Sequence, residues 1–501
     1  MDELVHHFLD HSAERFPDKK AVFHGEESAT YAEIVQAANR LANLLKEEGL
    51  KKSDRVLMAM ENSIASIISY YAIIKAGGVV VEVPDKSTQS EVSYFINDCK
   101  PRIGIFSKAS ARRLDGISIP MIITPAMEFA NPNGRYIEWD KANQLPATDP
   151  AIEIKDNELV SIVYTSGSTG KPKGVMLSNR NISSNTSSII SYLGITSADR
   201  IMVVLPFYYV YGKSLLNPHF KVGGSLVINN RFAFPNVVVD EMQNKEVSGF
   251  AGVPSTFAIL LNRSIFPKTR IPTLRYVTQA GGSMAPALTA RLMEVLQGTD
   301  LYIMYGATEA SPRLTYVPPG RLKDKLGSIG IPIPDVSISI KDEHGKELPP
   351  GVEGNICATG PNIMQGYWGD EQETGKVIKP WGLITGDIGY KDEEGYFYTT
   401  GRKKEMLKVG GERISPKEIE DVLIESKLVH ETAVIGRPDD FLYEVPEAFI
   451  VPIDPKTFDL EDVKTYTKQR LSVHKHPKYW HIVKSMPKKS SGKIDKEALK
   501  K

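Results

Sequence analysis

A short segment rich in glycine, hydroxyl and lysine residues is the part of the sequence best suited to chemistry. Residues 164–174 read Tyr-Thr-Ser-Gly-Ser-Thr-Gly-Lys-Pro-Lys-Gly and follow an apolar run directly. Glycine lets successive backbone N–H groups converge on an anion, hydroxyls donate to phosphate oxygens, and lysines add positive charge. The segment is not a Walker A motif, because Gly167 and Gly170 are three residues apart and Pro172 follows Lys171. It predicts a phosphate-binding loop made by Thr165, Ser166, Gly167, Ser168, Thr169, Gly170 and Lys173.

Four shorter motifs follow this loop along the chain. They are Tyr-Gly-Ala-Thr-Glu at 305–309, Thr-Gly-Asp at 385–387, Gly-Arg-Lys-Lys at 401–404 and Ser-Gly-Lys-Ile-Asp at 491–495. With the loop, they make the sequence resemble the adenylate-forming superfamily, which contains acyl- and aryl-CoA synthetases, the adenylation domains of peptide synthetases and firefly-type luciferases. The similarity runs over nearly the whole chain, and motifs in a common order are far more specific than any one of them.

The resemblance implies a ligase that works in two steps. A carboxylic acid attacks the α-phosphorus of ATP to give acyl-AMP and pyrophosphate, and a thiol then displaces AMP. The thiol would be coenzyme A or, alternatively, the phosphopantetheine of an acyl or peptidyl carrier protein. Such catalysis is mainly positioning and charge stabilisation. A nucleotide-binding module without catalysis is a further alternative, which the intact motifs disfavour.

The resemblance also assigns the nucleotide contacts. Thr308 would contact the α-phosphate, and Glu309 would bind Mg²⁺, which prefers oxygen ligands. Tyr305 would pack against the adenine. Asp387, expected in a turn after an apolar strand, would accept hydrogen bonds from the ribose hydroxyls, and Arg402 would add a second contact.

One lysine near the end of the chain is assigned to the first reaction step. By resemblance, Lys493 neutralises the repulsion between the acid and the α-phosphate. Members of this family rotate a C-terminal domain between the two steps, which places a hinge at Lys404. The rotation would replace Lys493 with Gly410 and Gly411, which would line a tunnel for the thiol arm.

The segment 206–212 is expected to form one wall of the acid-binding pocket. It reads Pro-Phe-Tyr-Tyr-Val-Tyr-Gly, so Tyr209 stands where the family often has histidine, and Tyr209, Val210 and Tyr211 make a largely apolar wall with phenol hydroxyls. No aspartate is present there to bind an α-ammonium group, which disfavours an ordinary α-amino acid. Lys213 could meet a second carboxylate of the acid or point to solvent, and we expect solvent.

A second segment, 278–283, is expected to form the opposite wall. Its small residues leave room for both adenine and acyl group, with Gln279 and Gly282 toward the acid and Gly281 toward the nucleotide. Ile303 stands where many members carry Asn, Asp or Gln for the adenine amino group. Isoleucine cannot make that contact, so adenine would be recognised by backbone alone.

The elements that must position these residues alternate between helices and short apolar strands. Helical spacing at 33–49 and apolar runs at 79–83, 103–106 and 121–123 predict parallel sheets covered on both faces. After about residue 328, turns alternate with strands, which indicates an antiparallel β subdomain. We therefore expect an α/β fold: a large N-terminal domain at 1–401 with a β subdomain at about 328–400, and a small mobile α+β domain at 402–501.

Composition excludes several other classes of protein. The chain has 501 residues, with 61 Lys plus Arg and 61 Asp plus Glu, so a nucleic-acid binder is not expected. Two cysteines, Cys99 and Cys357, cannot build a disulfide scaffold or a four-cysteine zinc site. The apolar run at 64–76 is too short for a membrane span and predicts a buried helix. Together with the absence of a signal-peptide pattern, this predicts a cytoplasmic protein. The last residues, 463–501, are strongly basic, which suits either an acidic partner or solvated helices.

Overall fold

The computed structural model describes residues 3–114, 116–125, 134–165, 172–439, 441–489 and 492–500. Of the predicted phosphate loop it places only the flanks, Thr165 and Lys173. The remaining predicted loop residues, which lie outside the described residues, are Ser166, Gly167, Ser168, Thr169 and Gly170.

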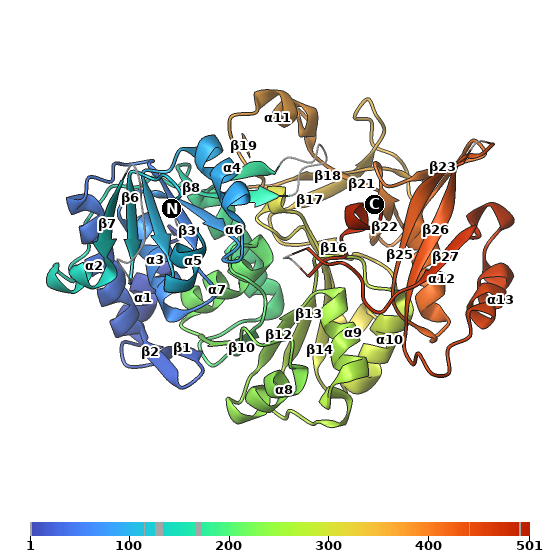
Figure 1. Cartoon of the computed structure of the whole chain (residues 1–501), viewed down its shortest axis with the longest axis horizontal. Helices are drawn as coiled ribbons and strands as arrows, with labels where there is room; N and C mark the ends of the chain where they lie inside the picture. Colours follow the sequence, from blue (N-terminus) through green and yellow to red (C-terminus); the bar gives the residue numbers. More distant parts are fainter. Residues whose placement is uncertain are drawn as a thin grey trace.

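One large mixed sheet is built mainly from the N-terminal third of the chain (Figure 1). Its strands lie in the order β19-β9-β8-β4-β3-β5-β6-β7, parallel from β8 to β7, with β9 and β19 added antiparallel. The strands are β3 (Arg55–Ala59), β4 (Val79–Val83), β5 (Ile103–Phe106), β6 (Met121–Thr124), β7 (Arg135–Glu138), β8 (Leu159–Thr165), β9 (Lys173–Ser178) and β19 (Gly366–Tyr367). The predicted phosphate loop connects β8 to β9, and Thr165 pairs with Lys173 across that hairpin.

A second mixed sheet carries the next part of the chain. Its order is β16-β15-β14-β13-β12-β10-β11-β1-β2, parallel from β14 to β1, with antiparallel strands at both edges. The strands are β1 (Lys20–His24), β2 (Glu27–Thr30), β10 (Arg200–Val203), β11 (Ser225–Ile228), β12 (Gly249–Gly252), β13 (Tyr276–Gln279), β14 (Asp300–Tyr305), β15 (Thr315–Val317) and β16 (Ile331–Pro332). The predicted parallel α/β architecture is confirmed.

Helices separate the two sheets and cover their outer faces. The main hydrophobic core joins the inner faces of both sheets to α1 (His7–Arg15), α2 (Tyr31–Glu47), α3 (Ile64–Lys75), α6 (Asn179–Leu193) and α7 (Val210–Val222). Smaller cores place α4 (Gln89–Cys99) and α5 (Lys108–Arg113) outside the first sheet, and α8 (Pro235–Asn244), α9 (Pro254–Arg263) and α10 (Pro286–Val295) outside the second. Side chains alternate between these layers, since Val56 and Met58 lie in the main core and Leu57 in an outer one.

Two helices illustrate why the sequence folds this way. The Thr30 side chain accepts from the N–H of Glu33, and Glu33 returns a contact to the N–H of Thr30, so α2 begins with a capping box. The apolar run at 64–76 becomes α3, whose residues are largely buried, as predicted. No helix within the described ranges is both long and apolar enough to cross a membrane.

An antiparallel sheet follows the two large sheets. It contains β17 (Ser337–Lys341), β18 (Gly354–Thr359), β20 (Ile378–Lys379), β21 (Gly382–Lys391) and β22 (Phe397–Arg402), with α11 (Glu371–Val377) beside it. The expectation that Asp387 lies in a turn is wrong. Asp387 lies inside β21 and pairs in register with Arg402 of β22. The strand continues past the Thr-Gly-Asp motif because β22 pairs with β21 from Asp387 to Lys391.

The last hundred residues form a small α+β unit around one sheet (Figure 1, orange to red). Its elements are β23 (Leu407–Val409), β24 (Glu412–Ile414), α12 (Pro416–Glu425), β25 (Val429–Asp439), β26 (Tyr443–Pro452), α13 (Leu460–Arg470), β27 (Tyr479–Ile482) and α14 (Lys496–Leu499). Many lysines of the basic segment pair with acidic residues of the same unit, such as Lys488 with Glu431 at 2.6 Å and Lys475 with Glu418 at 2.6 Å. The domain boundaries proposed from the sequence stay predictions.

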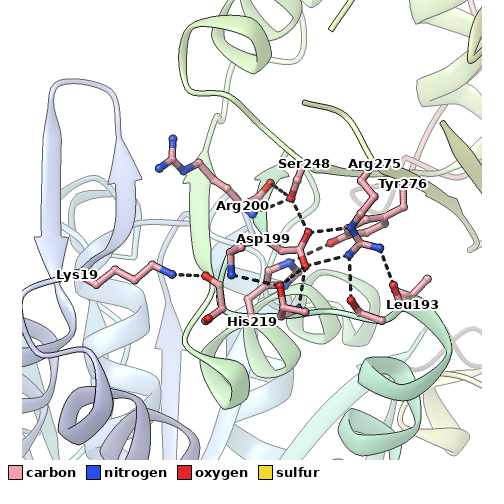
Figure 2. Close-up of polar contacts among 12 residues, drawn as sticks. Lys19, Leu193, Asp199, Arg200, His219, Ser248, Arg275 and Tyr276 are labelled. Carbon is pink, nitrogen blue, oxygen red and sulfur yellow. Dashed lines mark hydrogen bonds and ion pairs between the residues drawn. The ribbon is translucent and has the colours of Figure 1, made fainter. Parts of the chain in front are cut away.

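A partly buried polar network links the amino ends of neighbouring strands in the second sheet (Figure 2). The Arg275 guanidinium donates to both oxygens of Asp199 at 2.9 and 3.1 Å and to a carbonyl at the end of α6. Ser248 donates to Asp199 at 2.8 Å, and His219 lies 3.0 Å from the Tyr276 hydroxyl. Asp199, Ser248 and Arg275 immediately precede β10, β12 and β13, so the network fixes the edge of the sheet opposite to the one that carries the candidate site.

Candidate active site

The carboxyl ends of β13 and β14 carry much of the predicted chemistry. β13 ends at Gln279, two residues before Gly281, and β14 ends at Tyr305, three residues before the start of the 3₁₀ turn Thr308–Ala310. Parallel neighbours place their carboxyl ends at one edge, where ligands of open α/β sheets bind. Gly306 is required there, because a Cβ at this position would lie 1.7 Å from the Pro312 carbonyl oxygen.

Asp387 joins the end of β14 to the antiparallel sheet. Its Oδ2 accepts from the Tyr305 hydroxyl at 2.6 Å, and its Oδ1 accepts from Arg402 Nε at 3.1 Å. Asp387 is 7% exposed, and its charge raises the pKa of Arg402, while burial and the same charge raise the pKa of Tyr305. A carboxylate has lone pairs for about four hydrogen bonds, so Asp387 can still accept from a diol. The contact also fixes the orientation of the Tyr305 ring.

Glu309 and Lys173 form a second polar group beside the predicted loop. Glu309 Oε1 accepts from the Tyr367 hydroxyl at 2.8 Å, and Lys173 pairs with Glu373. Burial and the charge of Glu309 raise the pKa of Tyr367, which keeps its hydroxyl a donor. Lys173 Nζ also lies 5.1 Å from the centre of the Tyr367 ring. Tyr367 and Glu373 were not predicted, because no local motif links them to residues so distant in the sequence.

Lys493 extends from the C-terminal unit toward the strand ends. Lys488 and Ile494 form an antiparallel bridge, and Ser255 of α9 donates to the Gly492 carbonyl at 3.1 Å. This holds the lysine so that a Cβ built on Gly281 would lie 3.7 Å from its Cε. The side chain of Lys493 remains exposed in this arrangement. Desolvation and the charge of Arg402 lower its pKa, opposed by Asp387 and Glu309.

The predicted pocket walls lie next to this group. The ring of Tyr211 would lie 3.8 Å from a Cβ on Gly281. Its hydroxyl donates to the Thr278 carbonyl at 3.0 Å. Gln279 donates to the Gly282 carbonyl at 2.9 Å, while its buried Oε1 finds no hydrogen-bond partner within the described part of the chain.

The expected solvent exposure of Lys213 is wrong. Its ammonium pairs with Glu82 Oε2 at 2.9 Å, and the two side chains are only 12% and 11% exposed. The carboxylate comes from β4, more than a hundred residues earlier, so the local sequence gives no signal of it. The other two wall residues, Tyr209 and Val210, are half-buried at the start of α7.

The proposed hinge and thiol tunnel lie away from these strand ends. Lys404 is exposed in the turn between β22 and β23. Gly410 and Gly411 form the turn between β23 and β24 with φ of 59° and 91°, a region that favours glycine. Figure 1 shows β23 at the upper end of the C-terminal unit, away from β13 and β14, whereas Lys493 reaches Gly281 at the end of β13.

The site and fold together define an adenylate-forming enzyme, and comparison with known proteins specifies the family. The model described as "AMP-binding enzyme" matches residues 9–368, and "AMP-binding enzyme C-terminal domain" matches residues 418–493. The chain therefore belongs to the AMP-binding enzyme family, among its acid–thiol ligases.

Characterised relatives cover nearly the whole chain. A long-chain-fatty-acid–CoA ligase of Bacillus subtilis is 30% identical over 530 residues, covering 99% of this chain and 94% of the relative. A feruloyl-CoA synthase of Amycolatopsis is 29% identical, covering 95% and 94%. The structure of O-succinylbenzoate coenzyme A synthetase from Bacillus subtilis with ATP and magnesium ion superposes with a TM-score of 0.85 at 26% identity, over 99% of both chains.

Proposed function

We propose that this chain uses ATP to convert a carboxylic acid into acyl-AMP and pyrophosphate, and then transfers the acyl group to coenzyme A. The observation that carries the proposal is the approach of Lys493 to Gly281, within the electrostatic reach of Arg402, Asp387 and Glu309. Motifs far apart in the sequence thus meet at one strand edge. The relatives named as CoA ligases support coenzyme A as the acceptor.

The nucleotide would lie along the carboxyl ends of β13 and β14. The free lone pairs of Asp387 fit the ribose hydroxyls, and Tyr305, oriented by its hydrogen bond to Asp387, fits the adenine face. Thr308 and the β8–β9 loop would hold the phosphates. The side chain of Ile303 cannot donate to or accept from the adenine, so backbone groups near Gly281 would recognise it.

Glu309 fits a magnesium ion bound mainly through the nucleotide. Oε1 is held by Tyr367, which leaves Oε2 for a metal. The residues that the structure describes contain no cluster of three or more His, Cys, Asp or Glu side chains that could hold a metal. Phosphates and water would therefore supply the remaining ligands, as is common for Mg²⁺. When bound, the ion neutralises charge on the phosphate oxygens.

Lys493 would supply the charge on which the first step depends. An acid carboxylate and the α-phosphate repel each other, and an ammonium between them lowers that repulsion most as the new bond forms. The lowered pKa of Lys493 comes partly from desolvation, and a partly desolvated charge interacts more strongly with a bound anion.

The second step would need another arrangement of the C-terminal unit. We place a hinge at Lys404 between an N-terminal domain at 1–401, with its β subdomain at about 328–400, and a mobile domain at 402–501. Rotation would withdraw Lys493 and bring the bare backbone of Gly410 and Gly411 to the acyl-AMP, where a pantetheine arm can pass.

Isotope exchange between pyrophosphate and ATP tests the first step. We expect label to enter ATP only when a cognate carboxylic acid is present. If none of the acids in a broad panel supported exchange, the proposal would be contradicted. Supplying either coenzyme A or a holo-carrier protein tests the second step. Thioester on coenzyme A is expected, and thioester only on the carrier would overturn the proposed acceptor.

A further inference from the structure

A small cavity lies directly beside the predicted acid pocket. It is bounded by Val210 and Lys213 of α7, Glu82 of β4 and Ser311, which follows the turn that carries Glu309. Val210 belongs to the predicted acyl wall, so the cavity is placed at the far end of that wall. It leaves about 30 Å³ for the centres of water-sized groups, which is room for one or two small polar groups but not for a whole acid.

An ion pair lines one side of this cavity. Lys213 Nζ lies 2.9 and 3.0 Å from the two oxygens of Glu82 and 3.9 Å from the centre of the Tyr70 ring. Burial lowers the pKa of Lys213 and raises that of Glu82, so the surroundings penalise both charges. A buried ion pair is weak support for stability, since apolar residues of similar volume often do as well. Stability alone therefore does not explain why Lys213 and Glu82 are buried together.

Unsatisfied polar atoms line the same cavity. Among the residues that the structure describes, Asn217 Oδ1 and Ser311 Oγ have no hydrogen-bond partner, and Asn217 and Ser311 are only 2% and 7% exposed. The Tyr70 hydroxyl is buried beside them, in a residue that is 1% exposed. Burial raises the pKa of Tyr70, and a side-chain hydrogen bond with Asn217 partly offsets this effect. A buried polar group without a partner destabilises the protein, so the cavity favours any ligand group that can form hydrogen bonds with these atoms.

We propose that this cavity receives the distal end of the acid substrate, and that this end carries an uncharged hydrogen-bonding group such as a hydroxyl or carboxamide. The inference rests on the proposed function and narrows its substrate class. Lys213 and Glu82 cancel in net charge, so a second carboxylate would face Glu82 and an ammonium would face Lys213. A hydroxyl can donate to Asn217 or Glu82 and accept from Ser311, whereas a plain hydrocarbon end leaves these atoms unpaired.

Matched acids in the pyrophosphate exchange assay test this inference. The pairs are para-hydroxybenzoate with benzoate, para-hydroxycinnamate with cinnamate, and omega-hydroxyoctanoate with octanoate. In the pair whose shape fits the pocket, we expect kcat/KM for the hydroxylated acid to exceed that for the unsubstituted acid by at least about tenfold. The reason is that a site built to hydrogen-bond a hydroxyl rejects an analogue that lacks one. Suberate, the dicarboxylic counterpart of octanoate, and terephthalate should be poor substrates.

Two variants connect the preference to the cavity. Ser311→Ala removes one polar atom, and the double variant Lys213→Met/Glu82→Gln removes both charges without leaving one unpaired. Each should reduce the hydroxyl preference severalfold by lowering kcat/KM for the hydroxylated acid alone. Ser188→Ala is the matched control, since Ser188 is a buried α6 serine that donates to the Pro334 carbonyl and does not line the cavity. It should leave the preference unchanged.

Exchange in which unsubstituted acids react as well as hydroxylated ones would overturn the inference alone, because the cavity would then hold only water. A preference for the dicarboxylic acids would also overturn it. Lack of exchange with every acid would instead overturn the proposed function, and the inference with it.

Discussion

At the scale of single residues, the site concentrates opposite charges where two anions must react. Lys493 lies in the electric field of Arg402, Asp387 and Glu309. Its position depends on a backbone contact, the hydrogen bond from Ser255 to the Gly492 carbonyl. An ammonium held by its backbone in this way is available to a ligand. Catalysis by such a group requires stronger contact in the transition state than in the ground state.

Replacement of Lys493 by alanine should therefore affect one half-reaction. Lys493→Ala removes the ammonium, and we expect the rate of acyl-AMP formation to fall by about a hundredfold or more, the usual effect of losing one such electrostatic contact. Thioester formation from supplied acyl-AMP should remain near normal. Single-turnover assays of the two steps measure this, with Lys500→Ala as the control, since Lys500 pairs with Glu497 at 2.8 Å on the surface. Equal loss in both steps would refute the assigned role.

At the scale of elements, the connection between β22 and α12 decides which residues reach the site. Gly401 is the last residue but one of β22, and Ser415 immediately precedes α12, so the two lie on opposite sides of the proposed hinge. A Cβ on Gly401 would lie 3.9 Å from the Ser415 Cβ, which matches the spacing of a disulfide. A covalent link there would hold the C-terminal unit in the arrangement described.

The double variant Gly401→Cys/Ser415→Cys tests the rotation. In the oxidised protein we expect acyl-AMP formation to continue and thioester formation to fall at least tenfold, because the glycines at 410–411 could not reach the acyl-AMP. Reductant should restore the second step. The reduced variant is its own control for backbone strain at Gly401, where φ is 150°. The native thiols Cys99 and Cys357 are buried and should not interfere.

Much of the element layout could be predicted from the sequence, because it depends on local patterns. The periodic apolar residues of α2 and the short runs of β4, β5 and β6 needed no distant information. The motifs likewise marked Tyr305, Asp387 and Lys493. The side chains that contact the site residues could not be predicted. For example, Glu82 contacts Lys213 and Tyr367 contacts Glu309 only through tertiary packing. The strand at Asp387 was missed for the same reason, since it depends on pairing with β22.

At the scale of the whole molecule, buried histidines at three separate places couple folding to pH. Burial lowers the pKa of His6 to about 3 and those of His219 and His430 to about 4. An unfolded histidine has a pKa of about 6.5, so the unfolded chain binds protons that the folded chain excludes. Stability from these groups is complete above about pH 6.5 and decreases as the pH falls toward 4. The Asp199–Arg275 network acts in the same direction at lower pH, because hydrogen bonds and Arg275 hold the pKa of Asp199 below its ordinary value against the effect of burial.

His219 provides the sharpest test of this coupling. Its Nε2 lies 3.0 Å from the Tyr276 hydroxyl (Figure 2) and its Nδ1 lies 2.8 Å from the Leu215 carbonyl oxygen, so both nitrogens of the neutral ring have a partner. Burial disfavours the charge that a second ring proton would add. Each such group contributes at most about 1.4 kcal/mol per pH unit to the loss. His219→Gln should lower the melting temperature at pH 7.5, because it disturbs a buried contact, but should make the further decrease between pH 6.5 and 5 shallower than in the wild type. His24, which is half-buried at the end of β1, is the control, and His24→Gln should leave the pH dependence unchanged. Parallel melting curves for His219→Gln and the wild type across this range would show that His219 does not couple folding to protonation.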